Sequence, residues 1–386
     1  MLAHSPSLPL TIDHVRGYPK TTTEDEEDIL LALQNRERVR RIRLLVPIPN
    51  LQKLIMAMDE EFPMLEYLYI APPIKDNTSL IFPISFQAPH LRHLILIGFD
   101  FPIRSPLLTS AVGLRTLTLE EIHPSIHFCP NDLLQPLSLM PQLETLIISF
   151  HSPVPNRDVQ RQLLQTPIMT HVTLPYLRWF AFSGVSAYLE SVLPRMTTPL
   201  LERLRITFFN QLTYSVPHLL QFMITTENLR FSIATFGFYD WGVLVRVDPY
   251  EGARTYALHM EITCIPFDWQ VASAAQIFYE LGTVFSAVEY LTLEYSGAFM
   301  PSSGADRGQW RKLLRSFRNV KTLRVGNKLT GELSHSLKLD DGESPMDLLP
   351  ELKGLVCSAG GDFDNPFTTF INARQVVGHP VALVHG

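Results

Sequence analysis

Residues 89–97 read PHLRHLILI, and the pattern of this stretch decides the fold class of the chain. Its third, sixth and eighth positions are apolar and hold Leu91, Leu94 and Leu96. Because alternate residues of a β-strand point to the same face, Leu94 and Leu96 would both point inward. The stretch therefore predicts one short strand that buries its leucines.

The same phrase, with apolar residues at its first, fourth and sixth positions, recurs along the chain. The nine copies begin at Leu65, Leu91, Leu114, Leu143, Leu177, Leu201, Val288, Val320 and Leu352, and a further one is plausible at Val39. From Leu65 to Leu201 the successive steps are 26, 23, 29, 34 and 24 residues. Steps of about 20 to 29 residues are typical of leucine-rich repeats, and longer steps indicate loop insertions.

A single copy of the phrase is too small to fold alone. Burying three aliphatic side chains stabilises a copy by roughly 5 to 9 kcal/mol, whereas ordering about two dozen residues costs more than that in backbone entropy. The copies must therefore stack on one another, as the units of repeat proteins do.

Helix signals occur between the strand phrases. Asn50, Ser186 and Asp268 each precede a stripe of apolar residues at helical spacing, which is the place of a capping residue. Thr23 and Glu26 have the spacing of a capping box. Strand, loop, helix and loop then alternate. This predicts an α/β fold, a leucine-rich-repeat-like curved solenoid with parallel strands on the concave face and helices on the convex face.

The repeats are irregular. An asparagine is expected eight residues after the first apolar position, but the early copies lack it, so the sequence does not predict the curvature. Between residues 229 and 263 the pattern changes to alternating strands. We predict an N-terminal strand and capping helix in residues 1–35 and an irregular leucine-rich-repeat solenoid over residues 36–386. The solenoid would contain an inserted β-hairpin near residues 234–263 and a C-terminal cap near residues 366–386.

Composition argues against several classes of protein. The net charge of -6 and the pI near 6.1 give no general attraction to phosphate, so we expect no nucleic acid and no membrane as partners. The three cysteines are far apart and have no CxxC spacing, which predicts neither a disulfide framework nor a zinc site. The sequence shows no secretory signal and no apolar run of about 18 residues. We therefore expect an intracellular protein, cytoplasmic or nuclear.

No set of residues has the spacing of a familiar catalytic motif. The sequence has no GxSxG, no Walker loop, no GxGxxG after a strand and no HExxH, so we expect no enzyme activity, no catalytic residues and no cofactor. One alternative is a metal-dependent hydrolase that uses His123, His127 and Cys129. Pro124 and Pro130 favour an irregular loop there and no further ligand pair is nearby, so we expect no metal.

Acidic clusters occur at residues 24–28, 340–343 and 362–364. The first lies where a helix N-terminus is predicted, a place that favours acidic side chains, and the other two lie in glycine-containing loops. A solvated surface explains each cluster better than catalysis does.

The outward positions of the strand phrases predict a binding face. They hold Tyr67, Tyr69, His93, Trp179, Arg203, Arg205, Tyr290 and Arg324. Tyr, Trp and Arg are enriched at the energetic centres of protein interfaces, and solenoids bind through their concave surfaces. The competing interpretation is that aromatic residues are common in strands for their β-propensity. A small-molecule pocket has no cluster of basic residues to support it.

Five longer stretches carry a resemblance to a known family. They are residues 5–12 (SPSLPLTI), 217–230 (PHLLQFMITTENLR), 268–293, 310–325 (WRKLLRSFRNVKTLRV) and 367–384 (FTTFINARQVVGHPVALV). In these stretches the chain resembles the mushroom-type, or basidiomycete, fungal F-box proteins with degenerate leucine-rich repeats. The similarity covers nearly the whole chain, and none of the stretches is a catalytic motif.

In that family a segment similar to residues 5–12 follows an N-terminal F-box, a helical module that binds the Skp adaptor of a cullin-RING ubiquitin ligase. No F-box sequence precedes residues 5–12 here. The resemblance implies the target-recognition part of a ubiquitin-ligase substrate receptor, whose partner is an unknown target protein. The Skp adaptor is expected as a partner only if an F-box is restored upstream. The alternative is a free-standing interaction scaffold without a ligase role.

Overall fold

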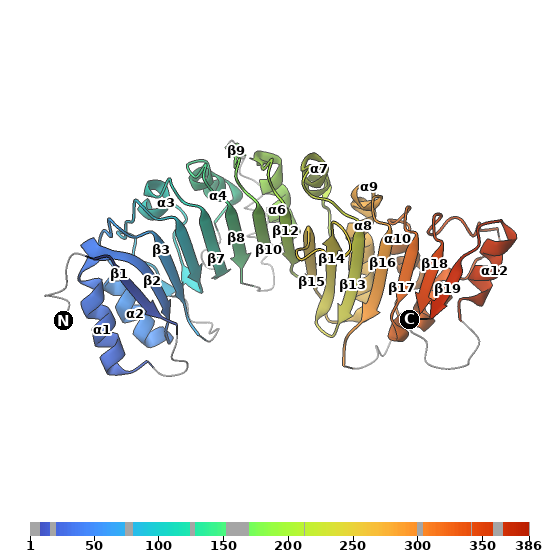
Figure 1. The fold of residues 1–386 in the computed structure, drawn as a ribbon, viewed down its shortest axis with the longest axis horizontal. Helices are drawn as coiled ribbons and strands as arrows, with labels where there is room; N and C mark the ends of the chain where they lie inside the picture. The colour runs from blue at the N-terminus through green and yellow to red at the C-terminus, as the bar shows by residue number, and fades with distance from the viewer. Residues whose placement is uncertain are drawn as a thin grey trace. The chain divides into compact units, whose positions relative to one another are not determined.

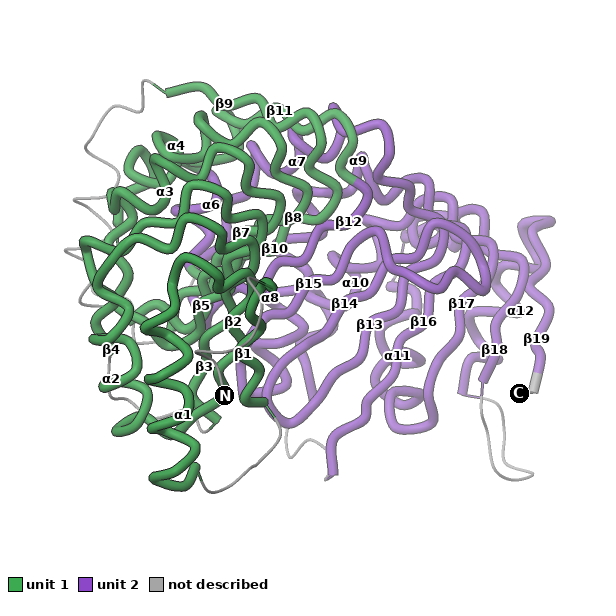
Figure 2. Tube along the Cα trace, turned by 60° about the vertical axis from the view of Figure 1, so that its left-hand side comes forward, with its two compact units in different colours: residues 1–184, 191–201 green, residues 185–190, 202–386 purple. Residues whose placement is uncertain are grey.

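The computed structural model describes nine segments of the chain. They are residues 8–15, 21–73, 80–123, 128–151, 170–211, 213–298, 304–340, 342–357 and 366–385. The chain forms two compact units, coloured separately in Figure 2. Unit 1 comprises Met1–Gly184 and Ser191–Leu201, and unit 2 comprises Val185–Glu190 and Glu202–Gly386.

The sheet of unit 1 is parallel throughout (Figure 1). Its strands follow the order β1 (Leu10–His14), β2 (Val39–Leu45), β3 (Tyr67–Ala71), β5 (His93–Ile97), β7 (Thr116–Ile122), β8 (Thr145–Phe150) and β10 (Trp179–Gly184). Two short parallel pairs lie outside it, β4 (Leu80–Ile81) with β6 (Phe99–Asp100), and β9 (Val172–Thr173) with β11 (Met196–Thr197). Parallel order agrees with the prediction of parallel strands, one for each phrase.

Helices connect the strands of unit 1. They are α1 (Thr23–Leu33), α2 (Ile48–Met56), α3 (Pro106–Ser110) and α4 (Pro130–Leu137), with short 3-10 turns at Arg36–Arg38 and Leu193–Arg195. Helix α1 packs against β1 and α2. Helix α6 (Ser186–Val192) falls partly in the residue range of each unit.

The sheet of unit 2 is parallel except at one strand. Its order is β12 (Arg203–Phe208), β15 (Leu258–Thr263), β14 (Gly242–Asp248), β13 (Ile233–Tyr239), β16 (Tyr290–Tyr295), β17 (Thr322–Val325), β18 (Gly354–Cys357) and β19 (Ala382–His385). Strand β14 is antiparallel to both neighbours, and the other pairs are parallel. The predicted α/β class with mostly parallel strands is confirmed.

The helices of unit 2 are α7 (Pro217–Thr225), α8 (Phe267–Glu280), α9 (Gly282–Phe285), α10 (Arg307–Leu314), α11 (Thr330–Leu337) and α12 (Thr368–Val376), with a 3-10 turn at Asn327–Leu329. Helix α8 packs against β14 and β15, and α10 packs against α8 and α11. One face of the sheet is therefore covered by helices, and the buried alternate residues of the strands lie on that side.

Corresponding positions of the phrases align across the strands. Leu68, Leu94, Leu117 and Leu146 are paired in register on β3, β5, β7 and β8, and each is 0% exposed. All nine predicted phrases end in a strand, so the prediction of one strand for each phrase is confirmed. The aligned leucines form a continuous row under the sheet, as stacking of incomplete units requires.

The segment predicted as an inserted hairpin, residues 234–263, contains three strands. The chain passes from β12 through α7 to β13, then returns through β14 to β15, which lies beside β12. Helix α8 then leads to β16, which pairs with β13. Two extra strands are thus placed between β12 and β13, while the parallel direction on either side is kept.

Helix starts differ from the predicted capping residues. Thr22, rather than Thr23, caps α1: its Oγ1 accepts a hydrogen bond from the Asp25 backbone N–H at 3.1 Å, and the Asp25 carboxylate accepts one from the Thr22 N–H at 2.9 Å. Glu26 faces α2 instead, where Asn50 and Lys53 donate to it. The prediction was one residue late because both pairs have the spacing of a capping box, and contact with α2 decides between them.

The other predicted caps are shifted in the same way. Helix α2 begins at Ile48 after Pro47, so Asn50 is inside the helix. Helix α8 begins at Phe267 after Pro266, one residue before Asp268. Pro47 and Pro266 are the N-cap residues of these helices, and the fixed φ of proline is compatible with the extended backbone at that position. Ser186 is the first residue of α6, and its hydroxyl donates to the side chain of Gln211 at 3.0 Å.

The predicted cap region, residues 366–386, contains α12 and β19. Strand β19 pairs in parallel with β18. Phe370 is buried at 3% exposure, and Arg374 is fully buried. The two guanidinium amino groups of Arg374 donate to four backbone carbonyl oxygens of the preceding loop, those of Pro345, Leu349, Pro350 and Leu352.

Candidate binding face

The open face of the unit 1 sheet carries a row of aromatic and polar side chains. In register across six strands, this aromatic row contains Arg41, Tyr67, His93, Thr116, Thr145 and Trp179. Three of the predicted face residues therefore belong to one row: Tyr67, His93 and Trp179. The fourth predicted residue of this unit, Tyr69, lies two positions further along β3.

Neighbouring side chains of the aromatic row contact one another. The Arg41 guanidinium carbon lies 4.1 Å from the centre of the Tyr67 ring, and the Tyr67 and His93 rings are 5.6 Å apart. The Nδ1 atom of His93 is 3.0 Å from the Thr116 hydroxyl oxygen. These contacts hold the two rings half-buried while one side of each remains accessible. The arrangement combines apolar area with polar groups, as interface centres do.

The electrostatics of this row follow from its partial burial. Burial is the main cause that lowers the pKa of His93, and the nearby Arg115 lowers it further. Burial also raises the pKa of Tyr69, assisted by Tyr67. The row therefore presents a neutral imidazole at pH 7, and Arg41 is its cation.

A second row on the same face is more apolar. Asp13 and Arg43 form an ion pair at 2.9 Å, and beyond them lie Tyr69, Ile95, Thr118 and Ile147 in register. Tyr69 thus stands between an arginine and an isoleucine. The second row widens the apolar part of the face beside the aromatic row.

In unit 2 the predicted face residues do not form one cluster. Arg203 and Arg205 lie on β12, Tyr290 on β16 and Arg324 on β17. Tyr290 is 45% exposed and lies opposite Thr322 in register. Four strands stand in order between β12 and β17, so Arg205 and Arg324 are separated by the width of those strands.

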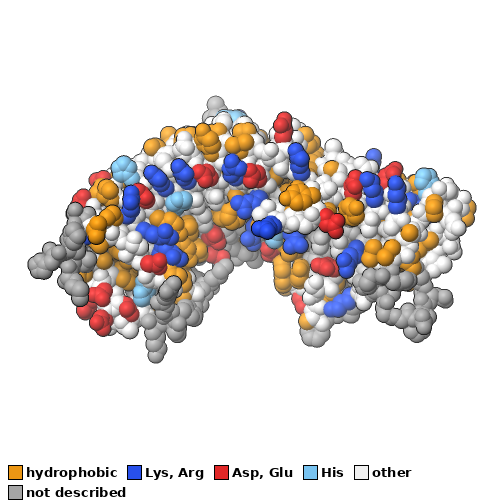
Figure 3. Space-filling model, in the orientation of Figure 1, with side chains coloured by type: hydrophobic (Ala, Val, Ile, Leu, Met, Phe, Trp, Pro, Cys, Tyr) orange, Lys and Arg blue, Asp and Glu red, His pale blue; other side chains and the backbone are white. Residues whose placement is uncertain are grey.

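Further residues of this face come from the strands between them. His259 on β15 lies opposite Arg205, and Arg246 on β14 lies opposite His259. Figure 3 shows Lys and Arg side chains gathered over this part of the sheet. Sequence reasoning missed both residues because they belong to no leucine phrase. The alternation Val243, Val245, Val247 could have placed Arg246 outward, but the strand order needed to bring it near Arg205 is not a local property.

Charged residues at the start of the strands are used within the framework. Arg40 pairs with Glu66 at 2.9 Å, Arg115 with Glu144 at 3.3 Å, and Lys321 with Glu289 at 2.6 Å. In each pair, both residues directly follow the first apolar residue of a phrase. The pair therefore joins two neighbouring phrases. Such exposed pairs contribute little stability, but they satisfy these charges locally.

The structure describes two of the three positions weighed as metal ligands, His123 and Cys129. His127 lies outside those residues. Cys129 precedes α4, where the Asp132 carboxylate accepts from its backbone N–H at 3.4 Å. Burial is the main cause that raises the pKa of the Cys129 thiol, and Asp132 adds to it. Within the described part of the chain, no group of three or more His, Cys, Asp or Glu residues could hold a metal ion.

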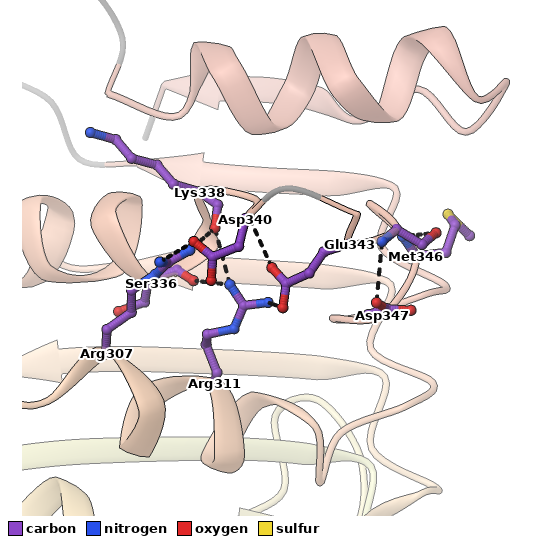
Figure 4. A network of polar contacts seen from close by, with 9 residues as sticks. Arg307, Arg311, Ser336, Lys338, Asp340, Glu343, Met346 and Asp347 are labelled. Carbon is purple, nitrogen blue, oxygen red and sulfur yellow. Dashed lines mark hydrogen bonds and ion pairs between the residues drawn. The ribbon is translucent and has the colours of Figure 1, made fainter.

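In the acidic cluster at residues 340–343, Asp340 and Glu343 take part in a network of ion pairs, drawn in Figure 4, and the Asp340 side chain remains exposed to solvent. Arg307 and Arg311 of α10 pair with Asp340 at 2.6 Å and with Glu343 at 2.5 Å, respectively. Arg311 also donates to the Lys338 carbonyl oxygen at 3.0 Å. Arg307 is the main cause that lowers the pKa of Asp340, and the Asp340 backbone N–H is the main cause that lowers that of Glu343. Carboxylates held ionised in this way tie α10 to the loop after α11. The cluster at residues 362–364 lies outside the described residues.

Among the described residues, no helix combines the length and the apolar character that crossing a membrane requires. No family model matches the sequence, and no curated protein matches it. The relation to fungal F-box proteins stays a prediction.

Proposed function

We propose that this chain is a protein-binding leucine-rich-repeat module and the target-recognition part of an F-box-type ubiquitin-ligase substrate receptor. The target would bind to the open faces of the sheets. This function places the protein in the cytoplasm or the nucleus, where ubiquitin ligases act.

The repeated register supports the leucine-rich-repeat assignment. Equivalent leucines of successive phrases lie opposite one another on parallel strands in unit 1, and equivalent residues of β16, β17 and β18 do so in unit 2. In this repeat class each repeat has about 20 to 29 residues and consists of one strand and a connection that returns to the next strand. A curved solenoid with strands on its concave face is the form that we propose for it.

The aromatic row of unit 1 is the observation that carries the binding role. Tyr67 and His93 are half-buried and are held by Arg41 and Thr116, so little side-chain freedom remains to be lost on binding. Preorganised aromatic rings beside an arginine are what interface centres contain.

The ligase role rests on the resemblance to the fungal F-box family. A free-standing interaction scaffold would use the same faces and differs only in the absence of Skp binding. Affinity capture with purified Skp adaptor distinguishes the two, using this chain and the chain extended by the sequence encoded upstream of Met1. Adaptor binding by the extended chain supports the ligase role. If neither chain binds the adaptor, the result supports the free-standing scaffold.

The binding role is tested by capture from a lysate of the source cells, with bound proteins quantified by mass spectrometry. The variant carries Tyr67→Ser and Tyr69→Ser, and the matched control is Tyr176→Ser, an exposed tyrosine of unit 1 that belongs to neither row. We expect the row variant to lose a defined set of proteins at least tenfold while the control keeps them. Equal capture by all three chains, with equal thermal stability, would contradict the proposal.

A further inference from the structure

One row on the open face of unit 2 consists entirely of hydrogen-bond donors. In register across six strands, this arginine row contains Arg205, His259, Arg246, Thr235, Thr292 and Arg324. The residues before and after each of them on the same strand are buried core residues, so all six point to the open face. No carboxylate interrupts the row.

The cations of the row lack strong partners within the described part of the chain. Arg246 has one carboxylate partner there, Asp248, at 3.6 Å. No described carboxylate lies within ion-pair distance of Arg205 or Arg324. Arg205 and Arg246 stand on either side of His259, two strand spacings apart, and like charges so placed repel. An anion bound over His259 would relieve that repulsion.

His259 is adapted to such an anion. Its ring lies 5.0 Å from that of Tyr256, and burial, followed by Arg205 and Arg246, lowers its pKa to about 4. The carboxyl group facing this region on the same strand is Glu261, whose pKa is raised by burial, while the nearby Arg205 lowers it. The neutral imidazole of His259 can donate one hydrogen bond to an incoming carboxylate.

Acidic residues flank the row and limit what it can bind. Glu261 on β15 and Glu294 on β16 lie two residues from the row on one side, and Asp248 on β14 lies two residues from it on the other. A broad anionic surface, such as a nucleic acid backbone or a membrane, would approach these carboxylates as well. A single narrow anionic strand laid along the row would not.

We propose that the arginine row binds an extended acidic segment of a partner protein, with its Asp or Glu carboxylates on Arg205, Arg246 and Arg324. Strands are about 4.8 Å apart, so the row spans roughly 24 Å, which matches about seven extended residues. This inference rests on the proposed function, because it names the kind of segment that the target would present to unit 2.

The test is fluorescence anisotropy with the full chain and a fluorescein-labelled eight-residue peptide of alternating Glu and Ser. The matched peptide of alternating Gln and Ser has the same length and no charge. We expect binding of the Glu peptide that weakens as salt is added, and at least tenfold weaker binding of the Gln peptide. Failure of the folded chain to bind the Glu peptide would overturn the proposal.

Charge reversal assigns the binding to the row. Arg205→Glu and Arg324→Glu should each raise the Kd for the Glu peptide at least tenfold. Arg318→Glu is the matched control, since Arg318 is an exposed arginine of the turn before β17 and should change the Kd less than twofold. Equal effects of row and control variants would show a general charge effect and contradict the proposal.

A second readout does not depend on variants. On binding of the Glu peptide, the NMR-detected pKa of His259 should rise by at least one unit, because a carboxylate stabilises the imidazolium form. An unchanged His259 titration in the complex would contradict the proposal. Tighter binding of a phosphoserine peptide or of anionic vesicles than of the Glu peptide would also overturn it, by assigning another ligand.

The outcome is separable from that of the proposed function. If Arg205→Glu and Arg324→Glu keep the proteins that depend on Tyr67 and Tyr69, the acidic-segment inference fails and the binding role stands. If the capture of no protein depends on Tyr67 and Tyr69, the proposed binding role fails, whether or not the Glu peptide binds.

Discussion

Arg374 of α12 donates a hydrogen bond of 3.2 Å to the carbonyl oxygen of Leu349, whose backbone is in the left-handed region at a φ of +50°. A residue with a side-chain Cβ pays about 1 to 2 kcal/mol for that conformation. The same guanidinium group binds three more carbonyl oxygens of the loop. The buried arginine therefore offsets the strain at Leu349 and fixes the loop that leads into β18.

Replacing Arg374 should destabilise unit 2. Arg374→Leu removes four donated hydrogen bonds from buried and part-buried carbonyl oxygens, of which that of Leu349 keeps a bond from the Leu352 N–H, at an expected cost of about 3 kcal/mol or more. Urea denaturation measures it, and Arg318→Leu, at an exposed site, is the control. Equal midpoints for the two variants would show that the Arg374 contacts contribute nothing.

The ring of Phe370 is expected to cover the last repeat. Phe370→Asp places a charge in a buried site and should cost about 3 kcal/mol or more. Because repeats stabilise their neighbours, β18 and β19 should lose hydrogen-exchange protection before β12 does. Thr369→Asp, on the exposed side of the same helix, is the control. Uniform protection in the Phe370 variant, or fast exchange after Pro366 in the wild type, would mean that this region is not a cap.

The cap of α1 distinguishes the structure from the sequence pattern. Thr22→Ala removes the acceptor of the Asp25 N–H and should cost about 1 kcal/mol. Thr23→Ala should change stability by much less, because the side chain of Thr23 makes no capping bond. Thermal denaturation of both variants tests this. A larger loss of thermal stability for Thr23→Ala than for Thr22→Ala would show that Thr23 is the capping residue, as the sequence pattern indicates.

His259 should make stability depend on pH in a defined window. Its pKa is about 4 in the folded chain and about 6.5 when unfolded, so the unfolded chain binds more protons between these values. The contribution of a neutral His259 is complete above pH 6.5 and is lost as the pH falls toward 4. The pKa of Glu261 is raised, so this residue favours the folded chain as the pH falls, which opposes the effect of His259. The contribution of His259 is therefore obtained by comparing the wild type with a His259 variant.

His259→Gln should flatten the loss of thermal stability between pH 6.5 and 4, and His379→Gln, at an exposed histidine, is the control variant. Parallel pH profiles for the wild type and His259→Gln would contradict the assignment.

The strands could be predicted from the sequence because their signal is local. Each phrase carries its own alternation, and the aligned burial of Leu94 and Leu117 follows from it. Tyr67 and His93 were placed on one face by the same alternation, and their contact needs only neighbouring repeats.

The arginine row could not be predicted, since it depends on strand order. His259 comes to lie beside Arg205 because β15 returns to β12, and pairing between segments 54 residues apart leaves no local trace. The burial of Arg374 could not be predicted for a different reason. A charged residue normally indicates an exposed position, and only the loop carbonyl oxygens that surround it make its burial favourable.

The central claim, that the open sheet faces bind a partner protein, is tested most directly by hydroxyl-radical footprinting of the chain with and without a captured partner. The account predicts protection of Tyr67, His93 and Trp179 on the open face of unit 1, with α3 and α4 modified equally in both states. Protection confined to α1, α2, α3 and α4, with the side chains of the aromatic row equally reactive in both states, would contradict it.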